Sequence, residues 1–235
     1  MSKKLTLCAV LAALLMLTAA LGVAQGDAIQ VGDSVFFGHY EQDNELSNGL
    51  EPIEWRVLLI DGDVAQLISR YALDAQPWNE QRTVARWTSC TLRIWLNTEF
   101  YNTAFGDAEK AVIVTKQIEN WKEDPTKDPV YLLDCDEAKQ LFSSHEDRMA
   151  TPTPYCVAQG VYQSTKYPLK KPKDMPGNAQ WWLRTHSWED KYRAAYVAGS
   201  GGVMTCGGNS DGRVENARWA VRPAIYVSLS ALAAM

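Results

Sequence analysis

The sequence predicts an α+β fold in which strands near both ends of the chain enclose a helical middle. Three observations support this prediction. Aromatic and β-preferring residues mark strands within 33–69, interrupted by a polar loop at 41–51. Apolar residues then take up helical spacing after Ser89, and short strand candidates return after position 179 between Gly-, Asn- and Asp-rich turns. Because strands and helices lie in separate blocks and do not alternate, a parallel sheet of βαβ units is disfavoured.

The first strands are predicted from composition and from one turn signal. Residues 33–40 are rich in aromatic and β-preferring side chains, which is typical of a strand. Segments 53–60 and 64–69 flank Asp61-Gly62-Asp63, and Asp-Gly supplies the positive φ angles that a tight hairpin turn requires. One face of this hairpin is expected to enter the core, and its alternating residues are Trp55, Val57 and Leu59.

The middle of the chain predicts helices. An amphipathic helix runs from Ser89 to about Thr103, capped by Thr88 or Ser89, with its apolar residues at helical spacing. Those apolar residues are Leu92, Trp95, Leu96 and Phe100. Further helices are expected at 107–115, 134–142 and 153–160, and a short buried strand at 131–133. The last helix begins at Thr153-Pro154, because proline at the first helical position gives up no needed hydrogen bond.

The end of the chain returns to short strands. The candidates, separated by turn-forming residues, are 180–184, 194–198, 203–206 and 219–227.

Residues 1–24 are typical of a secretory signal. Lys3 and Lys4 supply the positive start, an apolar run follows, and residues 22–24 are small enough for cleavage. We therefore predict cleavage near Gln25, a single mature domain over residues 25–235, a secreted or extracytoplasmic location, and no stable membrane insertion after cleavage. An uncleaved N-terminal anchor is the alternative, since the apolar run is at the short limit for crossing a bilayer.

The charge balance excludes some partners. The chain has 23 basic and 28 acidic residues, a formal charge of -5, and cleavage would remove two lysines and no acid. An acidic chain does not favour the phosphate neutralisation that dominates nucleic-acid binding, nor attraction to anionic lipid. We expect no nucleic-acid partner.

The predicted compartment bears on the oxidation state of the cysteines. The four that would remain after cleavage are Cys90, Cys135, Cys156 and Cys206. An even number in an oxidising compartment predicts one or two disulfides, although the sequence does not choose among the three pairings. The alternative is four buried thiols that pack as small apolar residues.

Six segments together carry a family resemblance. They are 35–40 (VFFGHY), 51–58 (EPIEWRVL), 88–100 (TSCTLRIWLNTEF), 104–109 (AFGDAE), 182–185 (WLRT) and 221–224 (VRPA). As a set they resemble a family of exported bacterial domains, the domain of unknown function numbered six-two-seven-three. The resemblance spans almost all of the mature chain.

The resemblance implies a C-type-lectin-like fold. The family's tryptophan-rich strand, Gly/Asn-rich hairpins and final Arg-Pro strand are similar to the ending of C-type-lectin-like and sulfatase-modifying-factor-like domains. In those domains the chain termini pair in one small sheet that two helices cover. We therefore expect small antiparallel sheets, two main helices and long loops. Thr185-His186-Ser187-Trp188 replaces the family's usual Ser-Pro-Gly turn, so a different loop is expected after Arg184.

The tryptophans are candidate ligand contacts. Trp181 and Trp182 are adjacent on a predicted strand and point to opposite faces. Either both faces are covered and both rings pack in the core, or one ring is a stacking platform for a sugar ring or a partner. Trp188 is an equally good platform candidate. The predicted ligand-binding residues are Trp181, Trp182, Arg184, Trp188, Asn209 and Asp211.

Three arginines lie in the family segments beside apolar residues. Arg93, Arg184 and Arg222 therefore need a carboxylate or several carbonyls, because an unpaired buried charge is expensive. We predict that they tie the terminal strands to the first helix, with ligand binding as the alternative. Trp95 and Asn97 of the same segment are also predicted to be structural.

Metal and cofactor chemistry is disfavoured. Asn209 and Asp211 belong to an oxygen-rich turn that could hold calcium, but the spacing is not that of an EF-hand and an ordinary turn is favoured. The three histidines lie in no metal-binding motif. A Cys206–His186 catalytic pair stays open, because such partners meet in space. Without a Gly-rich loop between a strand and a helix, nucleotide binding is disfavoured. We expect no metal and no cofactor.

These observations favour an exported, non-enzymatic recognition module. It would bind an unidentified glycan, a peptide or another surface protein through the loops between Trp181 and Trp219. The alternative is a cell-envelope hydrolase or modifying enzyme, and an architectural scaffold is a third possibility. A catalytic site predicts a concave pocket with hydrogen-bonded titratable groups, whereas a binding module predicts exposed aromatic rings on a shallow face.

Overall fold

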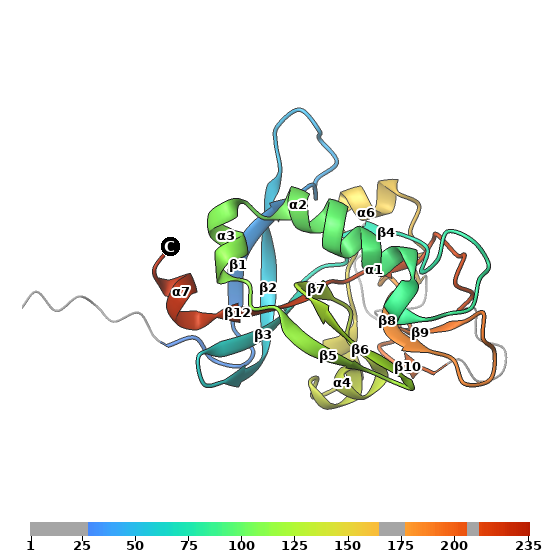
Figure 1. Ribbon diagram of the computed structural model, residues 1–235. Coiled ribbons are helices and arrows are strands. Elements are labelled where there is room, and N and C mark those ends of the chain that lie inside the picture. The colour runs from blue at the N-terminus through green and yellow to red at the C-terminus, as the bar shows by residue number, and fades with distance from the viewer. Residues whose placement is uncertain (1–27, 165–176, 206–211) are drawn as a thin grey trace, which may run out of the picture.

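The computed structural model describes residues 28–164, 177–205 and 212–235. In these ranges the strands form two five-stranded sheets and one two-stranded hairpin, with short helices around them (Figure 1). Pairing between the strands of these ranges is antiparallel except for the contact of β11 with β8, and an isolated bridge between Ala72 and Pro152 is also parallel. The α+β prediction is therefore confirmed at this level. The predicted signal segment, residues 1–24, lies outside the described residues.

The first sheet contains strands from both ends of the described chain, in the order β1-β2-β3-β12-β7. The strands are β1 (Ser34–Tyr40), β2 (Glu51–Asp61), β3 (Val64–Ser69), β7 (Val130–Tyr131) and β12 (Ala224–Ser228). The whole length of β12 pairs with β3. The last strand, β12, thus belongs to the same sheet as the first strand, β1.

The predicted hairpin is the β2–β3 pair, and Gly62 takes a φ of +58° at its turn. The expectation that Leu59 faces the core is wrong. A bulge shifts the register between Val57 and Leu59, which buries Leu58 and turns Leu59 to solvent. Trp55 and Val57 precede the bulge and are buried as expected.

The second sheet has the order β10-β9-β8-β11-β4. Its strands are β4 (Asp74–Ala75), β8 (Trp181–His186), β9 (Ala194–Val197), β10 (Val203–Met204) and β11 (Ala220–Val221). The predicted strand 219–227 is in fact two strands, β11 and β12, in different sheets. Pro223 lies between them, and proline has no N–H to continue a ladder.

The predicted first helix is interrupted. Its segments are α1 (Thr91–Trp95), the π-helical turn η2 (Leu96–Phe100) and α2 (Tyr101–Ala104), preceded by the 3-10 turn η1 (Trp87–Ser89). Thr88 and Ser89 lie in η1, so neither caps α1. The cap is Cys90, whose Sγ accepts the N–H of Arg93 at 3.4 Å.

The other predicted helices exist but are shorter. They are α3 (Asp107–Val112), α4 (Cys135–Gln140) and α6 (Pro154–Ala158). Asp134 and Glu137 form a capping box on α4, and Thr153 caps α6 as expected. Two further helices were not predicted, α5 (His145–Arg148) and α7 (Leu229–Ala233).

The hairpin β5–β6 was also not predicted. Its strands are β5 (Lys116–Asn120) and β6 (Glu123–Asp128). Asn120 pairs with Glu123, so Trp121 and Lys122 form a two-residue tip. Figure 1 shows this hairpin beside α4 and the second sheet.

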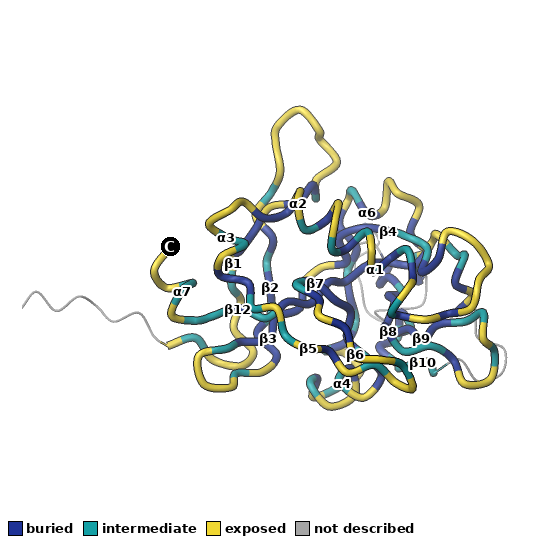
Figure 2. The backbone as a smooth tube through the Cα atoms, viewed as in Figure 1, coloured by how far each residue is buried: buried dark blue, intermediate teal, exposed yellow. Residues whose placement is uncertain are grey.

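One hydrophobic cluster joins the two sheets, and the buried segments that contribute to it lie in the interior of the protein (dark blue in Figure 2). Five fully buried tryptophans belong to it, and each indole N–H donates a hydrogen bond. The acceptors are Phe37 O for Trp55, Leu183 O for Trp78, Asp128 Oδ2 for Trp87, Arg148 O for Trp181 and Gln76 O for Trp182. These bonds satisfy the polar atom of each ring, so the rings add apolar burial without an unpaired donor.

Across the described ranges, no helix has both the length and the apolar composition needed to cross a membrane.

Candidate functional site

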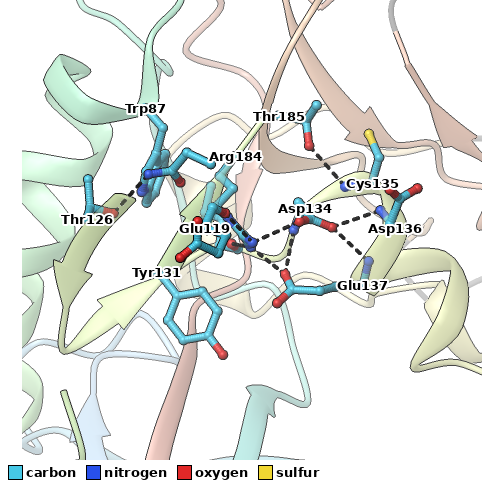
Figure 3. A network of polar contacts seen from close by, with 12 residues as sticks. Trp87, Glu119, Thr126, Tyr131, Asp134, Cys135, Asp136, Glu137, Arg184 and Thr185 are labelled. Atoms are coloured by element: carbon cyan, nitrogen blue, oxygen red, sulfur yellow. Dashed lines mark hydrogen bonds and ion pairs between the residues drawn. The ribbon is translucent and has the colours of Figure 1, made fainter. Parts of the chain in front are cut away.

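Arg184, near the middle of β8, is the centre of a polar network (Figure 3). Its Nη1 donates to Glu137 and to the Leu132 carbonyl at 2.9 Å, and its Nη2 donates to Asp134 Oδ2 at 2.8 Å and to the Glu119 carbonyl at 3.1 Å. Although burial works against the charge, the carboxylates of Glu137 and Asp134 raise the pKa of Arg184. The guanidinium therefore holds β8, the start of α4 and the end of β5 together.

The same region fixes the tip of the β5–β6 hairpin. The Glu119 carbonyl bound by Arg184 lies two residues before Trp121. At the tip, Lys122 takes a φ of +55°, a conformation that is uncommon for residues other than glycine. This turn presents the Trp121 ring at the surface, with the Lys122 ammonium 4.4 Å from the ring centroid.

Trp121 meets Trp188, which follows β8 in the chain. The two ring centroids are 6.3 Å apart in an edge-to-face arrangement, and both rings are exposed, 39% for Trp121 and 56% for Trp188. We call these two residues the tryptophan pair. The imidazole of His186 packs against Trp121 at a centroid distance of 4.9 Å. Two segments more than sixty residues apart thus build one aromatic surface.

Glu123 supports this surface from beneath. Its Oε1 accepts the Trp87 N–H at 3.0 Å and lies 3.0 Å from His186 Nδ1, while its Oε2 accepts the N–H and the hydroxyl of Thr88 at 3.1 and 2.8 Å. Burial opposes ionisation, but the bonds from His186, Thr88 and Trp87 hold the pKa of Glu123 below its usual range. An ionised carboxylate only accepts, so His186 Nδ1 is the donor in this contact.

Two hollows flank the tryptophan pair, and both are lined by Trp121 and Trp188. One has a volume of about 270 Å³, and we call it the basic hollow. Its charged lining residues are Arg86, Lys122, Lys191 and Glu123. The other has a volume of about 410 Å³, and we call it the acidic hollow. Its charged lining residues are Glu119, Asp134, Asp136 and Lys139. The pair therefore stands between surfaces of opposite charge.

The predicted platforms divide into buried and exposed rings. Trp181 and Trp182 have no exposed surface, so neither offers a face to a ligand in this structure. Trp182 instead stacks on Trp219 with 4.5 Å between centroids. Both faces of β8 are covered, so the adjacent rings of Trp181 and Trp182 both pack in the core, which is the alternative to a stacking platform. Trp188 alone among the predicted platforms has an exposed ring.

Other predicted site residues have structural contacts or lie elsewhere. Arg184 is buried: both of its Nη atoms donate to protein acceptors, and its Nε is a buried donor without a partner among the described residues, so the side chain presents no surface to a ligand in this structure. Asn209 and Asp211 lie outside the described residues, as does Cys206, so the calcium alternative and the Cys206–His186 pair stay predictions.

The prediction that the three arginines tie the terminal strands to the first helix is wrong, because their partners lie elsewhere. Arg93 on α1 pairs with Asp128 of β6 at 2.6 Å, not with a terminal strand. Asn97 joins η2 to β7, since its Nδ2 donates to the Arg93 carbonyl and its Oδ1 accepts the Val130 N–H. Trp95 packs on Phe100 at 5.7 Å.

Arg222 lies between β11 and β12 and is fully buried. It donates to the carbonyls of Ser69, Arg148 and Arg70 at 2.8, 3.4 and 3.5 Å. Its guanidinium also lies 5.2 Å from the centre of the Trp181 ring. Burial, with some repulsion from nearby arginines, lowers the pKa of Arg222 to about 9. Arg222 thus uses several carbonyls in place of a carboxylate, and it does not reach the first helix.

The disulfide prediction needs correction for three of the four cysteines. Cys90, Cys135 and Cys156 are buried free thiols, and no bond joins any two of them. Two disulfides are thereby ruled out, because they would require at least one pair among these three. Each thiol packs in a different place: Cys90 caps α1, Cys135 begins α4, and Cys156 lies in α6.

One group of carboxylates is close enough to hold an ion. Oxygens of Glu41, Asp43 and Glu51 lie within 4.8 Å of one another. The backbone N–H groups of Asn44, Glu45 and Gln42 already bond to them at 2.6–2.7 Å. The turn that follows β1 therefore accounts for the cluster.

A separate hollow of about 350 Å³ contains a pair of titratable groups. Tyr40 donates its hydroxyl to Asp74 Oδ2 at 2.5 Å, and the other oxygen of Asp74 accepts the Ala75 N–H at 2.6 Å. Burial raises the pKa of Asp74 despite these bonds. Trp95 and Glu99 of the interrupted helix also line this hollow.

Sequence reasoning missed Trp121, Lys122 and Glu123. The strands that carry them are polar, contain Pro125, and turn without glycine, so no local pattern marked a hairpin. The exposed tip could only be found from contacts distant in sequence, above all those of Arg184 and Glu123.

Comparison with known families agrees with the motifs. A family model described as "Domain of unknown function (DUF6273)" matches residues 57–229, well over half of the 235-residue chain. The chain belongs to this family. No curated protein and no solved structure matches it.

Proposed function

We propose that this protein is an exported recognition module that binds a saccharide at the tryptophan pair. The observation that carries the proposal is the side-by-side exposure of Trp121 and Trp188. An indole left in water forgoes the roughly 25 cal/mol per Å² that burial contributes, so adjacent exposed rings are typical of a binding surface. Export is inferred from the N-terminal segment alone, and N-terminal mass analysis of the secreted protein would test cleavage near Gln25.

The surroundings favour a saccharide over a peptide or a protein surface. The hollows of about 270 and 410 Å³ are near the size of small-molecule sites, roughly 300–1,000 Å³. A sugar ring has an apolar face that can lie on an indole and hydroxyls that can bond to the charged rim. A protein partner would need a larger contiguous surface, about 800 Å² on each side.

A C-type-lectin-like fold, which the family resemblance implies, would suit this function. Its support is the placement of β12 in the same sheet as β1, together with the exposed ring of Trp188 in the loop after β8. The step from fold to ligand is analogy, so the proposal rests on the site itself.

The test compares alanine variants on a glycan array, followed by titration calorimetry with the bound saccharides. Trp188→Ala and Trp121→Ala are each expected to weaken binding by about thirtyfold, the effect of losing a central aromatic contact worth ~2 kcal/mol. Phe36→Ala is the matched control, because Phe36 is 66% exposed and lies on β1 of the first sheet, which carries neither tryptophan of the pair. Unchanged affinity in both folded tryptophan variants, or binding only to a peptide array, would contradict the proposal.

A cell-envelope hydrolase is the second candidate, and the Tyr40–Asp74 pair favours it. A buried carboxyl group with a raised pKa in a hollow is a candidate general acid. An enzyme would release soluble fragments from purified cell-wall polysaccharide, and Asp74→Asn would stop the release. A recognition module would bind the same material and release nothing.

A further inference from the structure

The two sides of the tryptophan pair differ in charge, and the difference bears on the ligand. The basic hollow is lined by three cationic side chains, Arg86, Lys122 and Lys191, and by one carboxylate, Glu123. The chain as a whole has a formal charge of -5. A cluster of cations beside exposed aromatic rings on an acidic protein therefore calls for an explanation.

The carboxylate of Glu123 offsets only part of this charge, since the hollow has one carboxylate against three cations. Its side chain is only 5% exposed, and its two oxygens already face the Trp87 and Thr88 amides, the Thr88 hydroxyl and His186 Nδ1. Its charge is thus engaged on the inner side of the hollow. The outer side is left to the three cations.

Three separate segments bring these cations together. The Ala85 N–H donates to the Lys191 carbonyl at 2.7 Å, which places Arg86 beside the loop that follows Trp188. Lys122 comes from the hairpin tip, where its positive φ holds it next to the Trp121 ring. Strained backbone of this kind is concentrated at functional sites.

The neighbouring acids have other partners or lie outside the hollow. Asp190, next to Lys191, accepts Arg193 Nε at 3.0 Å and the Tyr192 N–H at 2.9 Å. Within the described part of the chain, Arg86, Lys122 and Lys191 have no salt bridge. Three cations against the single carboxylate of Glu123 leave an excess of positive charge that attracts an anionic group.

We infer that the saccharide bound at the tryptophan pair is acidic, with its sugar ring against the indoles and its carboxylate or sulfate group in the basic hollow. This inference rests on the proposed function, because it assigns the ligand's charge at the same site. The acidic hollow offers no comparable excess of cations, since its one lysine, Lys139, lies 3.7 Å from Asp136, so the anionic group is directed to the basic hollow.

The test measures binding to carboxylated, sulfated and neutral oligosaccharides of matched length, with methyl-esterified oligogalacturonate as the neutral partner of oligogalacturonate. Acidic members are expected to bind at least about tenfold more tightly at low salt, and the preference is expected to shrink in 0.5 M NaCl, where the Debye length falls to a few Å. The carboxylated and sulfated arms distinguish the two sources of charge.

Charge reversal provides the matched variants. Lys122→Glu/Lys191→Glu is expected to weaken binding of the acidic saccharide at least about tenfold, because the variant loses two attractive cations and gains two carboxylates that repel the anionic group. Lys127→Glu, an exposed position on β6 of the same hairpin, is the control and is expected to change affinity less than twofold. Circular dichroism confirms that each variant is folded.

The outcomes separate the two claims. Equal binding of acidic and neutral saccharides, or no loss in the folded double variant, would overturn the acidic assignment and leave the saccharide proposal standing. Binding to none of the saccharides would overturn both. Tight binding of an acidic member that both the double variant and Trp188→Ala lose would support both.

Discussion

Replacing Arg184 by methionine tests whether its network holds the second sheet to α4 and β5. The Arg184 side chain is 4% exposed, whereas its partners Asp134 and Glu137 are 27% and 25% exposed. Methionine replaces the unbranched stem of arginine with an apolar chain but removes the guanidinium, whose Cζ lies 5.9 Å from the centre of the Tyr131 ring, and with it all donors. Both carboxylates and the carbonyls of Leu132 and Glu119 lose a partner in the variant.

The magnitude follows from what each partner can recover. Breaking a fully buried ion pair costs about 3–5 kcal/mol, but carboxylates that are a quarter exposed regain some hydration. The Leu132 carbonyl belongs to a fully buried residue, and a buried acceptor left unsatisfied costs about 1–3 kcal/mol. Together these effects predict a loss of about 3 kcal/mol in the free energy of unfolding.

The assay is urea unfolding at pH 7, followed by circular dichroism. Arg193→Met is the control, because Arg193 makes a similar 3.0 Å ion pair with Asp190 but the two side chains are 25% and 36% exposed. Such a pair contributes about 0–1 kcal/mol. If the two variants lose the same free energy of unfolding to within about 1 kcal/mol, the larger stabilisation expected from burial of the Arg184 network is refuted.

Three further predictions concern single positions. Gly38→Ala is expected to cost about 3 kcal/mol and Gly62→Ala about 1 kcal/mol. Both have positive φ, but a Cβ on Gly38 would lie 2.5 Å from a neighbouring aromatic carbon while one on Gly62 meets nothing within 4 Å. Equal losses in thermal unfolding would refute this difference. Burial raises the pKa of the Cys135 thiol to about 11. The stability it contributes is complete below the unfolded pKa near 9 and falls as pH rises toward 11, so the urea midpoint is expected to drop from pH 9 upward, less so in Cys135→Ala. For Glu123, whose pKa is lowered, the contribution is present above the unfolded value of 4.5 and is lost as pH falls through the folded value. Glu123→Gln is therefore expected to flatten the decline of the urea midpoint below pH 5, and an unaltered profile would argue against the bonded carboxylate.

Local signals in the sequence predicted much of the first sheet. The Asp-Gly turn located the β2–β3 hairpin because its backbone requirement is strict, and Thr153-Pro154 located the start of α6 for the same reason. The failures came where a local rule competed with packing. Leu59 fits the alternation of β2, but the bulge that precedes it depends on how the whole strand fits the sheet.

The candidate site was less predictable than the fold. Trp188 was singled out from the chain, but its partner Trp121 was not, because β5 and β6 show no apolar alternation. Trp181 and Trp182 fit the platform pattern equally well until both faces of β8 were known to be covered. Exposure of a ring depends on neighbours distant in sequence, which no local pattern contains.

The stability of the fold and the shape of the proposed binding surface depend on the same contacts. Arg184 fixes β5 through the Glu119 carbonyl, while Glu123 and Asp128 fix β6 through the amides of η1 and the side chain of Arg93. The hairpin tip is therefore anchored on both strands before any ligand arrives. A preordered surface loses little conformational entropy on binding, so more of the contact energy contributes to affinity. In the proposed site, rigidity supplied by these buried contacts would compensate for the small contact area of two partly exposed indoles and shallow hollows.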